Sequence, residues 1–234
     1  ETSQEMFPEY RIDAITNGVH ARTWMSDAMA SVLDRHMPNW RNDPYALRNA
    51  LNIPRDDIWQ AHMASKKDLF DVIAQQTGVS LDPETLTIGF ARRAATYKRA
   101  TLLLSQPDRL RQIASTAGDM QIVYAGKAHP ADEAGRALIR QIHQTAQEMD
   151  ERIKILYLPN YDMYLARLLV AGVDLWLNTP LPPMEASGTS GMKAALNGVI
   201  NFSVRDGWWV EGHIEDVTGW SIGSQHSTQQ KDDT

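Results

Sequence analysis

The 234-residue chain contains no cysteine. This absence excludes a disulfide framework, a zinc site built on thiolates and a cysteine nucleophile, and it suits the cytoplasm, where we expect the protein. Positive charge is also scarce, since 23 Lys and Arg residues stand against 29 Asp and Glu residues and give a net charge of −6. That balance argues against a general attraction to nucleic acid or to an anionic membrane. An anionic ligand must therefore meet a local cluster of basic side chains.

Long apolar segments are missing too. No run of about 18 apolar residues could span a bilayer, and the first ten residues lack the pattern of a signal peptide. The composition, 43% hydrophobic and 22% charged, is that of an ordinary globular protein. The last stretch, residues 224–234, is wholly polar, and the chain does not begin with methionine. We therefore expect a fragment of a longer protein, with a polar tail that is disordered or marks a truncation.

The apolar residues that are present change their spacing along the chain. Residues 47–80 show helical periodicity, and we expect Trp59 to pack nearby. Beyond residue 80, short β-rich runs alternate with helical stretches, which predicts βαβ units and a doubly wound, Rossmann-like parallel sheet of the α/β class. We accordingly divide the chain into a helical lead-in (1–80), a Rossmann-like domain (81–223) and the tail (224–234). The predicted strands are 86–91, 120–125, 153–158, 173–177 and 198–204, and the predicted helices are 98–105 with 109–116, then 132–148, 161–170 and the shorter 191–196.

Ligands of such sheets bind beyond the carboxyl ends of the strands, so the residues after each strand are informative. Arg92 and Arg93 follow the first predicted strand, and with Lys98 and Arg99 they place four cations within eight residues. Guanidinium and ammonium groups bind phosphate oxygens, although a run of charges is more often a solvated surface. Lys127 follows the second strand, Tyr161 the third, and residues 185–193 the fourth. We expect these four strand ends to form one polar site.

Residues 185–193 read Glu-Ala-Ser-Gly-Thr-Ser-Gly-Met-Lys and precede an apolar helical turn. Glycines and free backbone N–H groups at a helix start can bind phosphate, although the pattern also fits a plain glycine-rich loop. Lys193 is followed by alanine, so the segment is not a Walker A loop, and no G-x-G-x-x-G fingerprint follows a strand. An amine beside phosphate-binding backbone suggests pyridoxal 5'-phosphate, which lysine can hold through an imine.

Other polar features carry less information. Asn17 with Gly18 is by default a tight turn. The histidines have no spacing that defines metal ligands, so we predict no metal site. Trp208 and Trp209 are expected in a core or a domain interface.

Taken together and in order, these segments resemble the α-glucan phosphorylase family of glycogen, starch and maltodextrin phosphorylases, from about Asp13 to Gly223. The pyridoxal-phosphate signature of that family reads E-A-S-G-T-x-x-M-K followed shortly by L-N-G, and residues 185–193 and 196–198 reproduce it. Gly191, His20 and the segment 208–212 resemble the shorter bacterial and archaeal branch.

The resemblance implies the C-terminal half of a two-domain GT-B glycosyltransferase-type fold. It implies reversible phosphorolysis, in which orthophosphate cleaves the terminal α-1,4 linkage of a glucan or maltodextrin and releases glucose 1-phosphate with retention. In the family, the phosphate of pyridoxal phosphate exchanges a proton with the substrate phosphate. Most of the N-terminal domain is missing, so we expect this chain alone to lack turnover, and we expect the full-length protein to be a homodimer.

The resemblance also implies the residues of the site. They are Lys193, Arg93 and Lys98 for catalysis, Lys193, Arg92, Tyr161, Thr189 and Ser190 around the cofactor, and Asn17, Tyr97, Lys127, Glu185, Ser187 and Gly188 around the substrate.

Two other functions remain open on the residues alone. A nucleotide-sugar-dependent glycosyltransferase, such as a glycogen synthase, would share the sheet but lack the tethering lysine. A non-catalytic sugar- or phosphate-binding module would retain the architecture without the chemistry. The presence of Lys193, Arg93, Lys98 and Glu185 together favours the phosphorylase.

Overall fold

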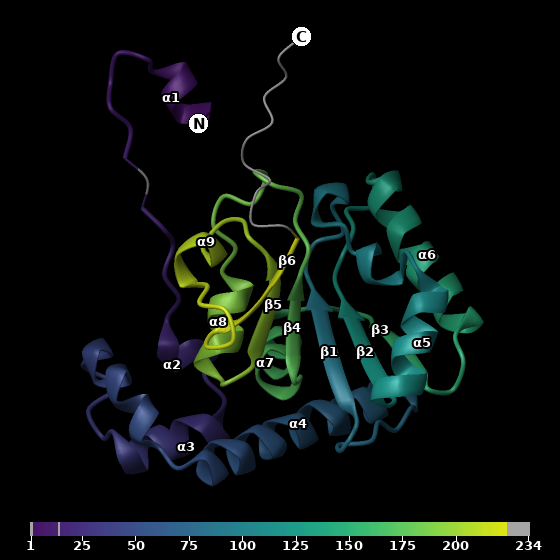
Figure 1. Ribbon diagram of the computed structural model, residues 1–234, viewed down its shortest axis with the longest axis horizontal. Coiled ribbons are helices and arrows are strands. Elements are labelled where there is room, and N and C mark those ends of the chain that lie inside the picture. The colour runs from purple at the N-terminus through teal and green to yellow at the C-terminus, as the bar shows by residue number, and fades with distance from the viewer. Residues whose placement is uncertain (1, 14, 224–234) are drawn as a thin grey trace.

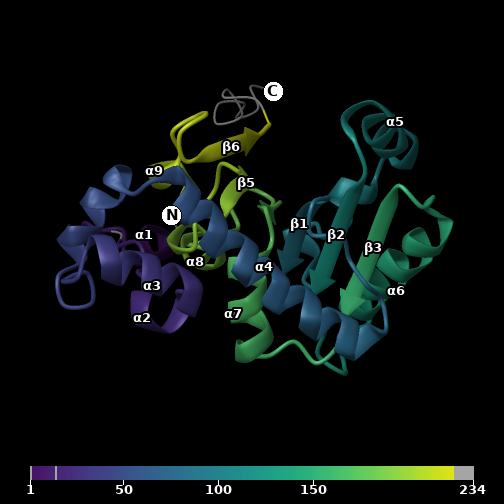
Figure 2. The ribbon, with the colours of Figure 1, turned by 90° about the horizontal axis from the view of Figure 1, so that it is seen from below.

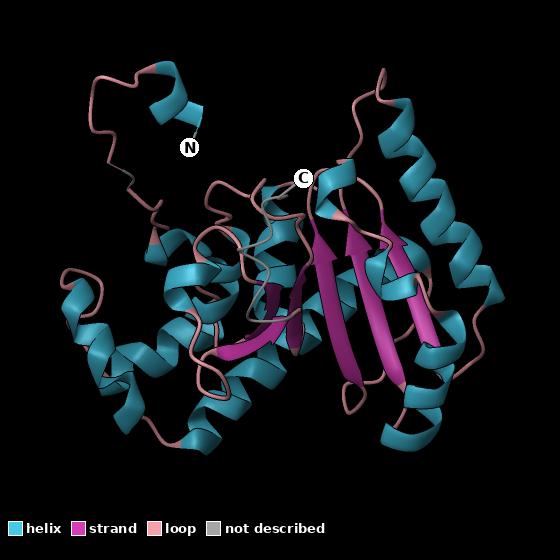
Figure 3. Cartoon of the chain, turned by 45° about the horizontal axis from the view of Figure 1, so that its top comes forward, coloured by secondary structure: helices cyan, strands magenta, loops and turns pink. Residues whose placement is uncertain are grey.

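The computed structural model describes residues 2–13 and 15–223, and the predicted polar tail lies outside the described residues. Its centre is a sheet of six strands, in which every neighbouring pair is parallel (Figures 1 and 3). The order is β3-β2-β1-β4-β5-β6, the strand order of the doubly wound Rossmann fold, so the predicted fold class is confirmed. The strands are β1 (Leu86–Ala91), β2 (Met120–Ala125), β3 (Ile153–Leu158), β4 (Leu175–Asn178), β5 (Ile200–Val204) and β6 (Gly219–Ile222).

Helices cover both faces of the sheet (Figure 2). In β2, Ile122 and Tyr124 pack against α5 (Pro107–Ala117) and α6 (Glu133–Glu148). The alternate residues Val123 and Ala125 pack against α4 (Arg55–Thr77) and α7 (Met163–Gly172). Because successive side chains of a strand point to opposite faces, a strand buried on both sides must be apolar throughout. The helices that follow the first strand are α5 (Pro107–Ala117), α6 (Glu133–Glu148), α7 (Met163–Gly172), α8 (Ser190–Leu196) and α9 (Trp209–Gly212).

The lead-in is helical, as predicted, but it is interrupted. Its elements are α1 (Thr2–Met6), α2 (Ala21–Trp24), α3 (Asp27–His36), the 3₁₀ helix η1 (Pro44–Asn52) and α4 (Arg55–Thr77). The predicted helix of residues 47–80 therefore begins only after Pro54, because proline disfavours helical geometry in the residue before it. The helix α4 runs beneath the sheet and joins this cluster of helices to α7 (Figures 1 and 2).

Three further sequence predictions were wrong. Residues 98–105 do not form one helix: they contribute to two short 3₁₀ turns, η2 (Thr96–Lys98) and η3 (Leu102–Leu104), because Arg99 adopts a left-handed conformation with φ of 47°. Asn17 and Gly18 lie in an extended segment without a turn. Trp59 does not pack in the core, since 58% of its surface is exposed. Of the paired tryptophans, Trp209 is fully buried, as expected.

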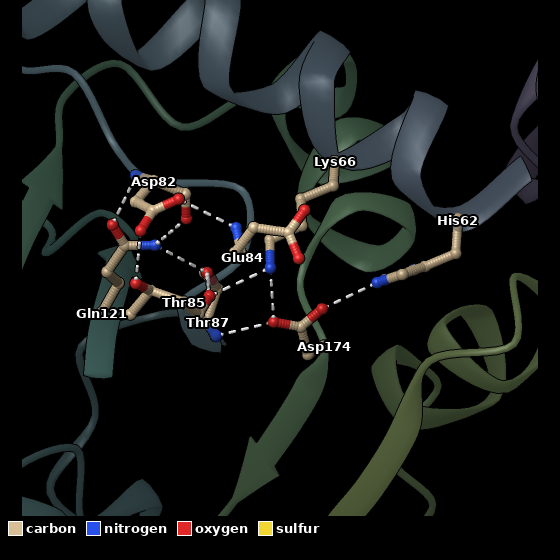
Figure 4. Close-up of polar contacts among 8 residues, drawn as sticks. All are labelled: His62, Lys66, Asp82, Glu84, Thr85, Thr87, Gln121 and Asp174. Atoms are coloured by element: carbon tan, nitrogen blue, oxygen red, sulfur yellow. Dashed lines mark hydrogen bonds and ion pairs between the residues drawn. The ribbon is translucent and has the colours of Figure 1, made fainter. Parts of the chain in front are cut away.

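A buried polar network ties α4 to the amino-terminal edge of the sheet (Figure 4). Asp174, just before β4, accepts hydrogen bonds of 2.7 Å from His62 Nε2, Lys66 Nζ and the backbone N–H of Thr87. Lys66 is 2% exposed and also donates to the carbonyl of Thr85. Burial acts to raise the pKa of Asp174, but these hydrogen bonds together outweigh it, so the pKa lies below its usual value. The carboxylate is therefore the charged centre of the network.

The crossing of α4 and α7 depends on Gly172. A Cβ atom there would lie 2.7 Å from Leu69 Cβ and 2.7 Å from the carbonyl oxygen of Ser65. We expect Gly172→Ala to lower the free energy of unfolding by about 1–3 kcal/mol, because overpacking forces the two helices apart. Urea denaturation measures the change. Gly18→Ala is the matched control, since a Cβ atom at that position would meet no atom of the described residues within 4 Å. Equal stability of the two variants would contradict the prediction.

Candidate active site

An ion-paired cluster lies beyond the carboxyl ends of β1 and β4. Arg92 Nη2 lies 3.1 Å from Glu185 Oε2, and Lys98 Nζ pairs with the same oxygen. The side chains of Arg92, Lys98 and Glu185 are 10%, 8% and 12% exposed. Lys98 Nζ also lies 4.5 Å from the ring centroid of Tyr97. Two cations thus share one carboxylate in a site that is largely screened from water.

Arg92 retains unused hydrogen-bonding capacity. Its Nε and Nη1 atoms are buried and have no partner among residues 2–13 and 15–223, and the same holds for Ser187 Oγ. Burial lowers the pKa of the Arg92 guanidinium, with Glu185 opposing the shift. Burial also raises the pKa of Tyr161, which is close enough to Arg92 for its charge to oppose that shift. Because unpaired buried donors are costly, an anion bound here would find donors already in place.

The backbone that carries Arg92 is locked to the end of β2. The Arg92 N–H donates to the carbonyl of Ala125 at 3.1 Å, and the Ala94 N–H donates to the carbonyl of Lys127 at 3.2 Å. Gly126 makes this approach possible, because a Cβ there would lie 2.2 Å from the carbonyl oxygen of Arg92. The glycine and lysine after the second strand therefore serve this site through their backbone.

Lys193 lies on α8, after the loop that carries Glu185 and Ser187. Its Nζ is 3.6 Å from the ring centroid of Trp24 on α2. Burial lowers the pKa of this amine, which favours the neutral, nucleophilic form. Asn197 holds the two helices together, since its Nδ2 donates to the carbonyls of Trp24 and Lys193, both at 2.8 Å. The lysine is thus positioned by residues from both ends of the chain.

Trp24 is the residue that sequence reasoning missed. Trp24 is one of three tryptophans in the lead-in and belongs to no motif, and its distance of 169 residues from Lys193 hides the contact. The only signal was the Leu-Asn-Gly segment, whose Asn197 makes the connecting hydrogen bonds.

We expect Trp24→Ala to slow amine-specific labelling of Lys193 by severalfold near pH 8. Removing the indole exposes the amine and returns its pKa toward the usual value, so less of the neutral form is present at that pH. Acetylation rates by peptide mass spectrometry measure the effect, with Lys127 as an internal reference. Trp220→Ala, which removes an exposed tryptophan from β6, should leave the rate unchanged. An unchanged rate in Trp24→Ala would contradict the proposed shielding.

The predicted site residues divide into two groups. The structure brings Arg92, Lys98 and Glu185 together, with Tyr97 and Tyr161 beside them. Ser187 is buried in the same loop as Gly188. Thr189 is the N-cap residue of α8 and Ser190 its first residue, and within the described part of the chain the Thr189 side chain makes no capping hydrogen bond. Among the described residues, the side chains of Asn17, Arg93 and Lys127 are exposed and make no hydrogen bond or ion pair with this cluster.

Two kinds of feature are absent from the part of the chain that the structure describes. Within residues 2–13 and 15–223, no group of three or more His, Asp or Glu side chains is placed to hold a metal ion. In the same part of the chain, no helix combines the length and the apolar composition needed to cross a bilayer.

The fold and the site define a doubly wound α/β protein with buried cations and a shielded lysine at the carboxyl edge of its sheet, a combination suited to phosphorylated ligands. A family model described as carbohydrate phosphorylase matches residues 2–220. The chain belongs to this carbohydrate phosphorylase family.

Curated relatives agree with this assignment. The chain is 43% identical to a maltodextrin phosphorylase of Thermococcus litoralis over 93% of its length, and 39% identical to a glycogen phosphorylase of Mycobacterium tuberculosis over 92%. It is 38% identical to a glycogen phosphorylase of Aquifex aeolicus, again over 92%. The chain spans only 28%, 27% and 34% of these three relatives, respectively.

Proposed function

We propose that this chain supplies the part of an α-1,4-glucan phosphorylase that holds pyridoxal 5'-phosphate and the substrate phosphate. The reaction is reversible phosphorolysis of terminal α-1,4-glucosyl units of a glucan or maltodextrin, giving glucose 1-phosphate with retention. Residues 81–223 form the cofactor- and phosphate-binding domain, and residues 1–80 connect it to the rest of a GT-B-type enzyme. The proposal extends to this chain the activity for which two of its relatives are named, a maltodextrin phosphorylase and a glycogen phosphorylase.

One observation carries the proposal: a lysine with a lowered pKa stands after a glycine-rich loop whose carboxylate binds two buried cations. A lowered pKa increases the fraction of the amine that is neutral, and the neutral amine is the form that attacks an aldehyde. The orphaned Arg92 Nε and Nη1 supply N–H donors to a phosphate. These groups fit pyridoxal phosphate, which would be held covalently by Lys193.

When bound, pyridoxal phosphate would supply acid–base chemistry through its phosphate group, next to the substrate phosphate. The role of this chain is to keep two anionic groups together, since two unit charges 4 Å apart repel by about 4 kcal/mol at an effective dielectric of 20. Arg92 and Lys98 provide the opposing charge. Arg93 follows Arg92 directly and is exposed, so it is free to turn toward an arriving orthophosphate. Around the glucosyl unit, the candidates are Asn17, Tyr97, Lys127, Glu185, Ser187 and Gly188.

Glu185 has a further role in this scheme, because its carboxylate neutralises the same cations that a phosphate would bind. We expect Glu185→Gln to bind orthophosphate about tenfold more tightly, since removing a negative charge a few ångströms away is worth more than about 1.4 kcal/mol at moderate dielectric. Phosphorus NMR titration of the chain measures the affinity. Glu151→Gln makes the same change of charge at an exposed position and should leave the affinity unaltered. Weaker binding in Glu185→Gln would contradict this role.

The proposed function is tested by a chimera. The matched span of the Thermococcus litoralis maltodextrin phosphorylase is replaced by this chain, and orthophosphate-dependent release of glucose 1-phosphate from maltodextrin is measured. We expect turnover from the chimera, none from the chimera with Lys193→Arg, and none from the 234-residue chain alone. A folded chimera that binds pyridoxal phosphate but releases no glucose 1-phosphate would overturn the proposal.

A further inference from the structure

A cavity of about 590 Å³ lies at the amino-terminal edge of the sheet, the edge opposite the candidate active site. It is bordered by Leu86 at the start of β1, Ile200 at the start of β5 and Asp174 just before β4. The strands are up to six residues long and rise about 3.3 Å per residue, so the two edges are roughly 20 Å apart. The cavity is therefore separate from the Arg92 and Glu185 cluster.

One face of α4 forms the wall of this cavity. Arg55, Trp59, His62 and Lys66 all line it, and their spacing of three or four residues places them on one stripe of the helix. Trp59 is 58% exposed and lies next to His62, with ring centroids 5.4 Å apart. An indole that is neither buried in the core nor covered by another element in the described chain offers a flat apolar surface within a polar cavity.

The polar side chains at the floor of the cavity are held in place by ion pairs, but one of their hydrogen-bonding atoms has no partner among the described residues. His62 and Lys66 both point from α4 to Asp174 (Figure 4), and this ion-paired network fixes their side chains. The His62 side chain is 8% exposed. With Nε2 engaged by Asp174, His62 Nδ1 is left buried without a partner in the part of the chain that the structure describes. A buried ring nitrogen without a partner is uncommon, and a ligand hydroxyl is one group that can supply the missing bond.

The charges of the lining select a neutral ligand. Arg55 and Lys66 stand against three carboxylates, those of Asp56, Glu84 and Asp174, so neither sign dominates. Charged side chains of both signs bind hydroxyl groups, the cations as donors and the carboxylates as acceptors. Leu86 and Ile200 are each more than 40% exposed and extend the apolar surface of Trp59. A ligand with an apolar ring face and many hydroxyls matches this lining.

We propose that this cavity is a carbohydrate-binding site, with Trp59 as the stacking platform and the His62, Lys66 and Asp174 network as its polar floor. The volume lies within the range of about 300–1,000 Å³ typical of small-ligand pockets. The sugar assignment rests on the lining alone, whereas the choice of an α-1,4-linked oligosaccharide rests on the proposed function. Such a site would hold a glucan on the enzyme away from the reacting end.

The test is saturation-transfer NMR titration of the 234-residue chain with maltotriose. We expect saturable binding, an apparent Kd about tenfold higher in Trp59→Ala, and a Kd within about threefold of the original in Trp59→Phe, which keeps a ring. Circular dichroism checks that each variant is folded. Tyr45→Ala removes an aromatic residue that is 70% exposed and does not line the cavity, so it should bind like the unaltered chain.

Each other outcome overturns the inference. If maltotriose shows no saturable binding, or binds equally well to Trp59→Ala, then Trp59 does not form part of a sugar-binding site. Loss of binding in Glu185→Gln would place the ligand at the opposite edge of the sheet. Binding of adenosine but not maltotriose, with loss in Trp59→Ala, would identify an aromatic ligand. None of these results depends on labelling of Lys193, so failure here and failure of the proposed function are distinguishable.

Discussion

Replacing Lys193 with arginine should abolish covalent incorporation of pyridoxal phosphate into the chain. Arginine keeps the positive charge and much of the length of the side chain but cannot form an imine with the aldehyde, because the guanidinium stays protonated. The measurement is borohydride reduction after incubation with pyridoxal phosphate, followed by peptide mass spectrometry. In the unaltered chain, the label should be found on the peptide that contains Lys193, and in Lys193→Arg that label should fall to background.

Lys127→Arg is the matched control for this experiment. Lys127 is an exposed lysine at the end of a neighbouring strand, so its replacement removes an amine without touching the Trp24 contact. We expect its labelling pattern at Lys193 to equal that of the unaltered chain. If Lys193→Arg retained the full label, or if label accumulated evenly over the surface lysines, Lys193 would not be the cofactor lysine.

Asp174→Ala should be the most damaging single substitution for stability, lowering the free energy of unfolding by about 3 kcal/mol or more. The substitution leaves Lys66 as a buried charge without its counter-ion and removes the partner of His62. Removing one member of a buried pair costs far more than the net value of the intact pair. Urea denaturation at neutral pH gives the difference directly.

The matched control is Asp71→Ala, on the same helix. Asp71 pairs with Lys67 at 2.6 Å, but this pair is exposed, so we expect no measurable change. The effect of Asp174 should also depend on pH. The pKa of Asp174 is lower in the folded state than in the unfolded state. The carboxylate therefore contributes fully to the free energy of unfolding above the unfolded-state pKa of about 4, and this contribution is lost as the pH falls through the lower folded-state pKa. A difference between the two proteins that stayed constant down to about pH 2 would contradict this assignment.

The central strands were predictable because burial on both faces leaves a continuous apolar run. The predicted bounds of β1, β2 and β3 agree with the structure. β4 and β5 begin two residues later than predicted, because apolar residues such as Val173 and Val199 pack in the core before the ladder starts. β6 was missed, since its four residues include polar and exposed side chains and form no apolar run. Apolar composition marks the core, whereas hydrogen-bonded pairing decides where a strand begins.

The candidate site was only partly predictable, for a related reason. Arg92, Lys98 and Glu185 were found because a parallel sheet gathers the residues that follow its strands. The sequence could not show that Glu185 pairs with both cations, since residues 98 and 185 are far apart in the chain. Nor could it reveal the contact between Trp24 and Lys193 or the ion pair of Lys66 with Asp174. Those depend on how α2 and α4 pack against the sheet.

The strand order sets a sequence of events during translation. β1, β2 and β3 pair with their neighbours in the chain, so this half of the sheet can assemble as soon as it leaves the ribosome. β4 must then return to the far side of β1, where Leu175 pairs with Ile88. Arg92 and Lys98 are therefore synthesised well before the loop that carries Glu185. Until that loop emerges, Arg92 and Lys98 lack the carboxylate that pairs with both of them in the folded chain.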